Sequence, residues 1–244
     1  VNAQMRLYKK LGIKNAVAVI GGSMGGMQAL CYAIEHPTFA KHYIPMATTA
    51  YTRPWAIALN KIAIEAIRHD PNFQNGNYEK DDLKARGLVG LAVGRMAGLI
   101  AYLSPNLFIN KFGRDYVETD GLYELFGRFE IEKYLEHNSY SFPKFFDPLS
   151  YLYICKTINI FDAGRNKDKL EDSFLKIEGK LHLIAFKDDM LFFPNEMEEI
   201  RDIMIKIGKK DQVTFKLVDS SSGHDSFLVE VEKFEEHIKD ILKD

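Results

Sequence analysis

A serine among glycines is the first group along the chain that could do covalent chemistry. Ser23 stands in the pattern Gly-x-Ser-x-Gly, with Gly21 and Gly25 at its two ends. An apolar run precedes this pattern and a helical pattern follows it, so the serine is expected on a sharp turn between a strand and a helix. Such a turn exposes the hydroxyl, and the close approach of strand and helix favours glycine at both flanking positions. The spacing therefore predicts a nucleophilic serine.

The residue after the serine has a predicted role through its backbone. Met24 begins the expected helix, and a helix N-terminus carries unpaired N–H groups and a partial positive charge. The Met24 N–H is therefore predicted to stabilise the oxyanion that forms when a serine attacks a carbonyl group. The alternative interpretation of the whole Gly-x-Ser-x-Gly pattern is a glycine-rich turn that serves packing alone, since this pattern also occurs by chance.

A serine hydroxyl is a weak nucleophile and needs a histidine base, which in turn needs an orienting carboxylate. His224 is the predicted base, because it lies on the loop "SSSGHDSF" directly after a short apolar run. Asp188 and Asp189 both follow the preceding apolar run, and either satisfies the spacing of the acid; the alternative for both is an ordinary polar turn. Five other histidines fall in expected helices or strands, where structural roles are expected: His36, His42, His69, His182 and His237.

These side chains need a sheet to position them, and four short apolar runs are typical of its strands. The runs lie at 16–20, 42–49, 181–186 and 213–219. Helical patterns alternate with them, at 1–11, 24–36 and 53–68. Strands that alternate with helices predict an α/β fold with a parallel sheet covered on both faces. His224 could then reach over the carboxyl edge of that sheet.

Two amphipathic helices are expected toward the end of the chain. One lies between the last two strands and carries apolar residues on one face, namely Met197, Ile200, Met204 and Ile207. The other is expected as a single helix after the last strand, with Leu228, Val231, Phe234, Ile238 and Ile241 on its apolar face.

More than a hundred residues separate the second and third expected strands, and they are mostly helical and aromatic in pattern. Segments 122–137 and 150–161 are the clearest helices, and the charged stretch 164–176 is expected to lead back to the sheet along a solvated face. We interpret this region as an insertion between two strands of the sheet.

Composition narrows the class of partner. The chain has 244 residues, 46% of them hydrophobic, and a formal net charge of −2, which gives no electrostatic case for nucleic acid or for an anionic membrane. Its two cysteines, Cys31 and Cys155, suggest neither a disulfide scaffold nor a metal site. The most membrane-like stretch, 87–103, has Arg95 at its middle and is expected as a buried helix. With no signal peptide visible, the sequence predicts a cytoplasmic protein that acts on small molecules.

Several long motifs, taken in order, resemble one family. "LGIKNAVAVIGGSMGGMQAL" resembles the nucleophile segment of the homoserine O-acyltransferases, usually acetyltransferases, of the α/β-hydrolase superfamily. "DPNFQNGNY" and "GLVGLAVGRMAGLIAYLS" resemble the helices that follow, "FDPLSYLY" the lid, and "DDMLFFP" and "SGHDSFL" the acid and histidine loops. The matches cover essentially the whole chain. The resemblance implies an α/β-hydrolase fold with a core at 1–103 and 171–244 and a helical lid insertion at 104–170.

The resemblance also implies an activity. Aligned to the family's Asp-x-Leu-Phe pattern, "DDMLFFP" selects Asp189 as the acid beside Ser23 and His224. The implied reaction moves an acetyl group from acetyl-CoA to Ser23 and then to the hydroxyl of L-homoserine, a step toward methionine, with acetyl-CoA as co-substrate and neither cofactor nor metal. Arg95 matches the family's substrate arginine and Asp225 its substrate aspartate, a pair suited to a zwitterion. The alternative for Arg95 is a structural salt bridge.

The chain departs from the family pattern ahead of the serine. Members place roughly the first half of the sheet there, with the loop that gives a second oxyanion N–H, whereas Ser23 here stands near the first residue. Three explanations are open: the sequence is part of a longer chain, the N-terminal half is a separate polypeptide, or the chain is a fragment inactive alone. Only the C-terminal strands of the sheet are then expected.

Three other functions stay open at this stage. Succinyl-CoA could replace acetyl-CoA as the donor, and a serine esterase with the same triad would pass the acyl group to water. A non-catalytic remnant would bind a partner through its exposed sheet edge. The aromatic-rich lid helices also predict a homodimer.

Overall fold

The computed structural model describes residues 1–79, 88–118 and 123–243, and the chain divides into two compact units. Unit 1 is Val1–Thr52 with Phe161–Asp244, and unit 2 is Arg53–Ile160. The domain bounds predicted from the resemblance stay a prediction. Residue 103 lies inside unit 2, where the helices Pro54–Arg68 and Val89–Tyr102 pack on each other. Residue 170 lies inside unit 1, which the chain re-enters at residues 161–163, where these bond to residues 50–52.

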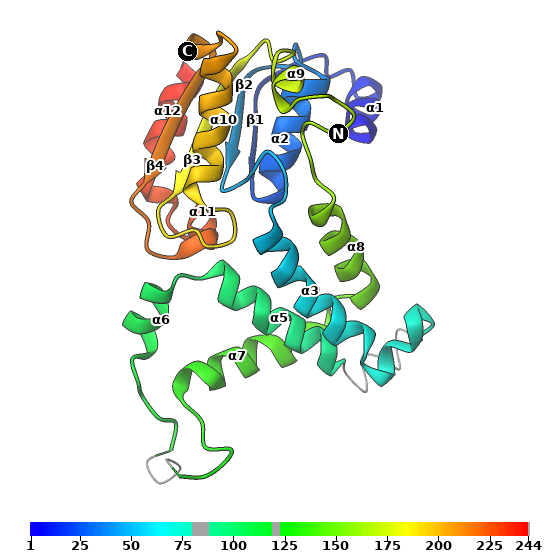
Figure 1. Ribbon diagram of the computed structural model, residues 1–244, viewed down its shortest axis with the longest axis vertical. Coiled ribbons are helices and arrows are strands. Elements are labelled where there is room, and N and C mark those ends of the chain that lie inside the picture. The colour runs from blue at the N-terminus through cyan, green and yellow to red at the C-terminus, as the bar shows by residue number, and fades with distance from the viewer. Residues whose placement is uncertain (80–87, 119–122, 244) are drawn as a thin grey trace. The chain divides into compact units, whose positions relative to one another are not determined.

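Unit 1 is built on a sheet of four parallel strands. In spatial order these are β1 (Ala16–Gly22), β2 (Ala40–Met46), β3 (Lys180–Phe186) and β4 (Val213–Val218), as Figure 1 shows. The predicted strands and their parallel arrangement are confirmed. The second strand ends at Met46, short of the predicted 49, because Ala47 takes a left-handed backbone conformation with φ 45°.

Helices cover both faces of this sheet. Four lie with one core cluster: α1 (Asn2–Lys10), α2 (Met24–Glu35), α9 (Leu170–Phe174) and α10 (Pro194–Lys206). On that face Tyr43, Leu181 and Leu183 are fully buried. The alternate residues Ile44, Ile184 and Phe186 pack instead with Phe234 and with Ile241 of α12 (Glu235–Lys243). Because both faces are buried, the two central strands are apolar along nearly their whole length.

The expected single C-terminal helix is wrong. The chain forms a short helix, α11 (Ser226–Val229), then a 3₁₀ turn at Val231–Lys233, and then α12. Glu230 separates the first two with a non-helical backbone (φ −121°, ψ 41°). Its carboxylate accepts hydrogen bonds from the Ser221 backbone and hydroxyl, so the residue serves the preceding loop and not a continuous helix.

A short antiparallel neck closes unit 1 where the chain leaves it and returns. Tyr51 and Asp162 form an antiparallel bridge. On either side of it, the Thr52 N–H donates to the Phe161 carbonyl at 3.0 Å, and the Ala163 N–H donates to the Ala50 carbonyl at 2.8 Å. Residues 53–160 therefore begin and end at one fastened point.

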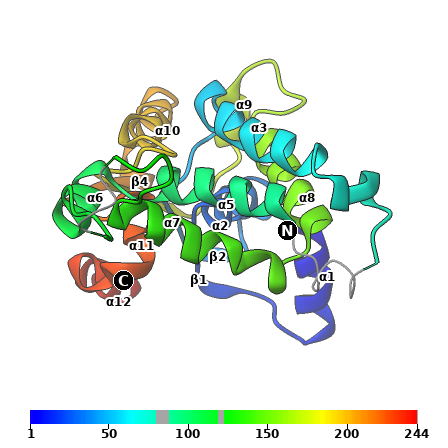
Figure 2. The same ribbon diagram turned by 90° about the horizontal axis from the view of Figure 1, so that it is seen from below.

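Unit 2 is helical, with α3 (Pro54–Arg68), α5 (Val89–Tyr102), α6 (Pro105–Phe112), α7 (Glu130–Tyr140) and α8 (Pro148–Asn159), seen from below in Figure 2. Glycines let α5 lie close to α3. A Cβ on Gly90 would stand 2.1 Å from the Ala66 carbonyl oxygen, and one on Gly94 would stand 3.0 Å from the Ala63 Cβ. The glycine-rich segment is thus a buried helix, as predicted. Gly87 of that segment and residues 119–122 of the predicted lid lie outside the described residues.

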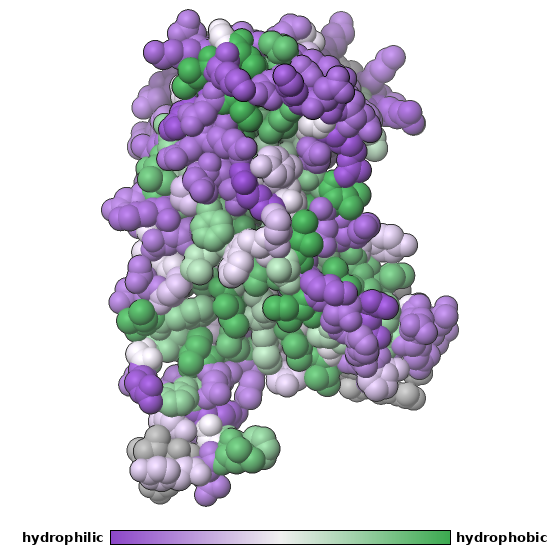
Figure 3. All heavy atoms as spheres, in the orientation of Figure 1, coloured by the Kyte–Doolittle hydropathy of each residue, from purple (hydrophilic) through white to green (hydrophobic). Residues whose placement is uncertain are grey.

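The surface of unit 2 carries much apolar area. Hydrophobic side chains gather over its helices in Figure 3, and among the most exposed are Tyr123, Leu125, Phe126 and Phe145. In the described parts of the chain no helix alone is long and apolar enough to cross a membrane, although the bent pair α5 and α6 together meets that test of length and composition. The predicted homodimer stays a prediction.

Candidate active site

Ser23 lies on the turn that joins β1 to α2. Its backbone is left-handed, with φ 56° and ψ −122°, a conformation that costs a non-glycine residue free energy and persists only where the surroundings fix it. The fixing bonds are visible on both sides. The Ser23 N–H donates to the Met46 carbonyl at 2.9 Å, and the Ser23 carbonyl accepts from the N–H groups of Gly26 and Met27. The turn is therefore held by the neighbouring strand and by the first turn of the helix.

The glycines around Ser23 have different steric reasons. A Cβ on Gly21 would lie 2.2 Å from the Gly25 carbonyl oxygen, and one on Gly22 would lie 2.4 Å from the ring of Phe227. At Gly25 an added Cβ would meet nothing within 4 Å. The prediction that crowding requires glycine on both sides of the serine is thus correct for Gly21 and wrong for Gly25. What the turn needs at position 25 is its backbone, which lies against Gly21.

The structure brings Ser23, His224 and Asp189 into one chain of hydrogen bonds. The His224 Nε2 lies 2.8 Å from the Ser23 Oγ, and its Nδ1 lies 2.8 Å from the Asp189 Oδ2. Each residue follows the carboxyl end of a different strand, which brings groups 201 positions apart in sequence within hydrogen-bond distance. An imidazole with a carboxylate on one nitrogen and a serine hydroxyl on the other has the geometry of a general base for that serine.

Burial and further contacts fix this arrangement. Asp189 is 2% exposed and His224 is 3% exposed. The second carboxylate oxygen of Asp189 accepts from the N–H groups of Leu191 and Phe192, at 2.9 and 3.0 Å, so the carboxylate cannot rotate freely. The rings of Phe192 and Phe227 meet the imidazole edge to face, with centroids 5.5 and 5.7 Å away. The hydrogen bonds therefore hold the Asp189 carboxylate in place, and the two aromatic rings confine the His224 imidazole.

The other acidic and imidazole groups take different places. Asp188 is partly exposed beside Lys187, and of the two adjacent aspartates it is Asp189 that bonds to His224. His42 and His182 form a buried pair inside the sheet, with 3.1 Å between Nδ1 and Nε2, and His182 also bonds to the Thr214 hydroxyl at 2.8 Å. That pair is a satisfied structural one.

Met24 is the first residue of α2, directly after Ser23. Its N–H belongs to the group of first-turn amides that have no partner within a helix. The placement is the one that the oxyanion role requires, because this amide and the serine hydroxyl adjoin on one turn.

Arg95 lies in α5, among aromatic rings and not in a salt bridge. Its guanidinium carbon is 5.0 Å from the centroid of the Phe142 ring and 5.8 Å from that of Tyr102. Its Nε is buried and has no hydrogen-bond partner, and within residues 1–79, 88–118 and 123–243 no carboxylate forms an ion pair with it. Cation–π contacts of this kind stabilise the charge but leave its N–H donors unused. The arrangement suits an anionic group that arrives from outside the chain.

Asp225 follows His224 in the 3₁₀ turn Gly223–Asp225 and precedes α11. It is partly exposed, and it lies in unit 1 whereas Arg95 lies in unit 2. Gly223 has φ 79°, a value that favours glycine, so the turn that presents both His224 and Asp225 depends on the residue before them.

Two contributors to the site escaped the sequence reasoning. Phe227 packs against both Gly22 and the imidazole, and Glu230 bonds to the loop before His224. Neither residue belongs to the apolar face predicted for the last helix, so the periodic pattern gave no signal for either. The signal that could have found Phe227 is Gly22 itself, a glycine inside a strand that indicates a close neighbour.

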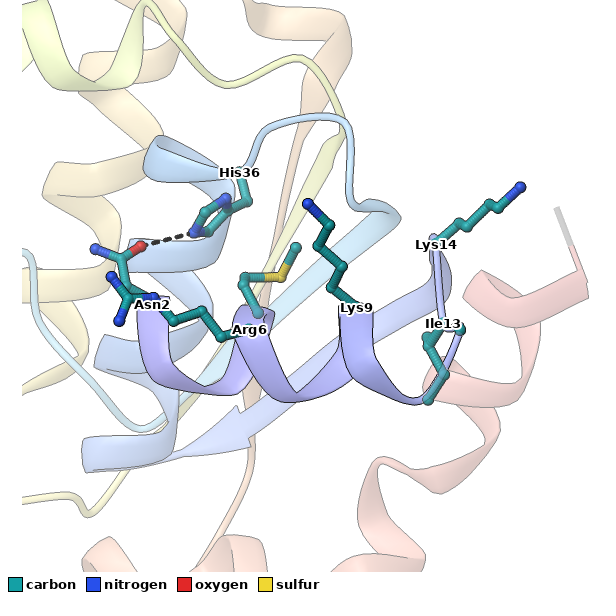
Figure 4. A pocket seen from close by; sticks show the side chains of 8 residues that line it. Asn2, Arg6, Lys9, Ile13, Lys14 and His36 are labelled. Atoms are coloured by element: carbon teal, nitrogen blue, oxygen red, sulfur yellow. Dashed lines mark hydrogen bonds between the residues drawn. The ribbon is translucent and has the colours of Figure 1, made fainter.

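A separate groove of about 710 Å³ lies along α1, at the other end of β1. It is lined by Asn2, Met5, Arg6, Lys9, Gly12, Ile13, Lys14 and His36, most of which Figure 4 labels. The seven residues of β1 separate it from Ser23 by about 20 Å. None of the predicted site residues lines this groove. Among the described residues, no three His, Cys, Asp or Glu side chains are placed to hold a metal ion.

The sequence of this chain is similar to one known family and to several relatives. Residues 3–231 match the alpha/beta hydrolase fold family. The chain is 55% identical over 243 residues to a homoserine O-acetyltransferase of Nautilia profundicola, and 54% identical over 242 residues to one of Sulfurimonas autotrophica. These alignments cover 100% and 99% of this chain but 66% of each relative, so the chain spans slightly less than two thirds of their length. The predicted resemblance is confirmed.

Solved structures agree on the fold. A homoserine O-acetyltransferase from Bacillus anthracis superposes with a TM-score of 0.90 at 23% identity, over 100% of this chain and 64% of that one. An esterase, E22, superposes with a TM-score of 0.87 at 26% identity, over 99% of this chain and 65% of that one. A protein named as an acetyltransferase and one named as an esterase therefore share this fold.

Proposed function

The chain belongs to the alpha/beta hydrolase family, and from this membership and the Ser23–His224–Asp189 hydrogen bonds we propose that it performs the acyl transfer of a homoserine O-acetyltransferase. The hydrogen bonds carry the proposal, because they give one serine a base and that base an orienting carboxylate. The relatives at 55% and 54% identity are named homoserine O-acetyltransferases, which supports homoserine as the acceptor and acetyl as the group transferred. Acetyl-CoA is the donor that the family resemblance implies.

In the first half-reaction the Ser23 Oγ attacks the carbonyl carbon of the acetyl thioester. His224 Nε2 takes the hydroxyl proton as the new C–O bond forms, and Asp189 keeps the imidazole oriented and stabilises its positive charge. The carbonyl oxygen becomes an oxyanion, which the Met24 N–H and the N-terminus of α2 stabilise. When the tetrahedral intermediate collapses, the C–S bond breaks and the CoA sulfur takes the proton from His224, which leaves an acetyl ester on Ser23.

In the second half-reaction the homoserine hydroxyl attacks that ester. His224 takes the hydroxyl proton and returns it to the Ser23 Oγ as the acyl–serine bond breaks, so the enzyme is restored and O-acetylhomoserine leaves. The base therefore serves both halves in the same position. This product is the methionine precursor that the motifs imply.

Homoserine is a zwitterion, and two residues suit its charged groups. Arg95 offers N–H donors that no described carboxylate uses, and its aromatic neighbours lower the local polarity, which strengthens a bond to a substrate carboxylate. Asp225, next to the base, suits the substrate ammonium group. From the family resemblance we assign each of these residues to a charged group of the acyl acceptor and not to acetyl-CoA.

A serine esterase is the second candidate, favoured by the likeness to esterase E22. It would use the same three residues and would pass the acetyl group to water. The cationic side chain of Arg95, unpaired among the described residues, argues for an anionic acceptor instead, since water needs no such group. A succinyl donor is the nearest variant of the transferase reaction.

The test follows the acyl group by intact mass. The protein is mixed with acetyl-CoA or succinyl-CoA, with and without homoserine, while free thiol is measured. The proposal expects an acetyl adduct on Ser23 that homoserine removes and that Ser23→Ala lacks. Thiol release that ignores homoserine would favour the esterase, and a preference for succinyl-CoA would change the donor. If folded protein is acylated by neither donor, the transferase proposal fails for this chain.

The acceptor assignment has its own comparison. Arg95→Ala should raise the KM for homoserine by about tenfold or more and leave that for acetyl-CoA nearly unchanged. Arg114→Ala is the matched control, since Arg114 also lies over an aromatic ring of unit 2, 5.4 Å from the Phe129 centroid. Equal effects of the two changes on homoserine would overturn the role of Arg95.

A further inference from the structure

The loop that carries His224 is tied together by a residue that lies after it. Glu230 follows α11, and its carboxylate accepts from the Ser221 N–H at 3.1 Å and from the Ser221 Oγ at 2.7 Å. Ser221 stands three positions before the imidazole. The Glu230 N–H also donates to the Ser226 carbonyl at 2.9 Å, so the residue bonds to the chain on both sides of His224.

A lysine joins Glu230 to the start of this loop, and we call the contacts among Glu230, Ser221 and Lys233 the clasp. The Lys233 Nζ donates to the Glu230 carboxylate at 3.0 Å and to the Asp219 carbonyl at 3.1 Å. Asp219 is the first residue after β4. Glu230 therefore bonds to residues 219–226 at three points: its carboxylate to Ser221, its N–H to Ser226, and through Lys233 to Asp219.

The surroundings of Glu230 favour the ionised form of its carboxylate. The residue is only 8% exposed, although a lone buried carboxylate is costly. Burial acts to raise the pKa of Glu230, but the hydrogen bonds from Ser221 and Lys233 outweigh it and lower that pKa to about 2. The carboxylate is thus ionised at neutral pH, and its bonds are of the strong, charge-assisted kind.

We propose that Glu230 is a positioning residue for the general base: by closing the 219–226 loop through Ser221 and Lys233, it holds the His224 imidazole between Ser23 and Asp189. The proposal rests on the proposed role of His224. The loop needs such a fastening because it contains three consecutive serines and Gly223 in a left-handed conformation, a composition with little stiffness of its own. A general base loses most of its effect when displaced by about an ångström.

The test compares Glu230→Ala, which removes the acceptor, with Glu230→Gln, which keeps the shape and one acceptor oxygen but not the charge. Glu171→Ala is the matched control, since Glu171 also pairs with a lysine in unit 1, Lys206 at 2.7 Å, away from this loop. Hydrogen exchange of the amides of residues 219–226 should rise by about tenfold to a hundredfold in the alanine variant, less in the glutamine variant, and not in the control.

Two further measurements separate positioning from general stability. The proton on the His224 Nδ1, hydrogen-bonded to Asp189, should give a downfield NMR resonance that Asp189→Asn abolishes. We expect this resonance to broaden or vanish in Glu230→Ala and to return in part in Glu230→Gln. The rate of Ser23 labelling by a fluorophosphonate, measured well below the melting temperature, should fall in the same order.

The NMR and exchange measurements need no acyl donor, so they stand even if the proposed transferase activity fails. If Glu230→Ala does not fold, Ser221→Ala and Lys233→Met test the same clasp from its other members and should each give part of the effect. The double variant Ser221→Ala/Glu230→Gln should label Ser23 no more slowly than the slower single variant, since both break one contact. An unchanged His224 resonance with unchanged loop exchange in folded Glu230 variants would overturn the proposal.

Discussion

The two glycines that flank the Gly-x-Ser-x-Gly serine should respond in opposite directions to the same added methyl group. In Gly21→Ala the new Cβ would stand 2.2 Å from the Gly25 carbonyl oxygen and 2.9 Å from the Gly25 Cα. Both are backbone atoms of the first helical turn, so neither can rotate away. Overpacking of this severity costs about 3 kcal/mol, the upper part of the usual range. For a chain of this size such a loss lowers Tm by about 6–12 °C.

Gly25→Ala is the matched change at the other flank. Its Cβ would meet nothing within 4 Å, and residue 25 lies inside α2, where alanine is favoured over glycine by about 0.5–1 kcal/mol. We therefore expect Tm to rise by about 1–4 °C. Serine reactivity should follow the same division: labelling of Ser23 by a fluorophosphonate should survive in Gly25→Ala and be lost in Gly21→Ala.

Differential scanning calorimetry on the three proteins, at one concentration and scan rate, measures the two shifts. The reasoning is refuted if Gly25→Ala melts as far below the wild type as Gly21→Ala does, because the two positions would then be sterically equivalent. It is also refuted if Gly21→Ala keeps the wild-type Tm and the wild-type labelling rate. Either result would mean that the turn can relax in a way that its backbone contacts exclude.

Three further outcomes are expected. Ser23→Gly should raise Tm by about 2–4 °C, because it relieves roughly 1 kcal/mol of strain at φ 56°, and should abolish serine labelling in the same sample. Glu230 has a folded pKa of about 2 against 4.5 for the free group, so its contribution, at most about 3 kcal/mol, is complete above pH 4.5 and is lost as the pH falls toward 2. Urea unfolding of wild type and Glu230→Gln at several pH values should show their difference shrinking across that window and constant above it. Burial raises the pKa of the Cys155 thiol from 9.0 to about 11, so native protein at pH 8 should react with Ellman's reagent about a hundredfold more slowly at this thiol than unfolded protein does.

The strands and the serine turn could be predicted because their signals are local. An apolar run, a glycine-flanked serine and a helical pattern stand within twenty residues, and the energies that place them act over the same short range. That His224 and one of Asp188 and Asp189 lie at one edge of the sheet could be predicted for a related reason: in a parallel sheet, whatever follows each strand lies at that edge. Spacing left the two aspartates open, and the family resemblance selected Asp189, the one that bonds to His224. For residues that directly follow a strand, the position in the chain therefore predicts the position in the fold.

What failed depended on contacts between distant segments. The break at Glu230 follows from its bond to Ser221, a neighbour that the sequence does not mark. The crowding predicted at Gly25 is absent because the helix leaves room there for a Cβ. Apolar periodicity runs on through Leu228 and Phe234, but the backbone is non-helical at Glu230, whose carboxylate bonds to Ser221. Apolar periodicity predicts which face of a helix is buried, but it does not predict a polar side chain that bonds to a neighbouring loop.

The fastened neck at Tyr51 and Asp162 has a meaning beyond the folding of one chain. Residues 53–160 begin and end at this bonded point, so for the folding of unit 1 they act as one long loop. Doubling the length of such a loop raises the entropic cost of closing it by only about 0.6 kcal/mol. Natural selection can therefore lengthen, shorten or exchange the inserted helices with little penalty to the sheet.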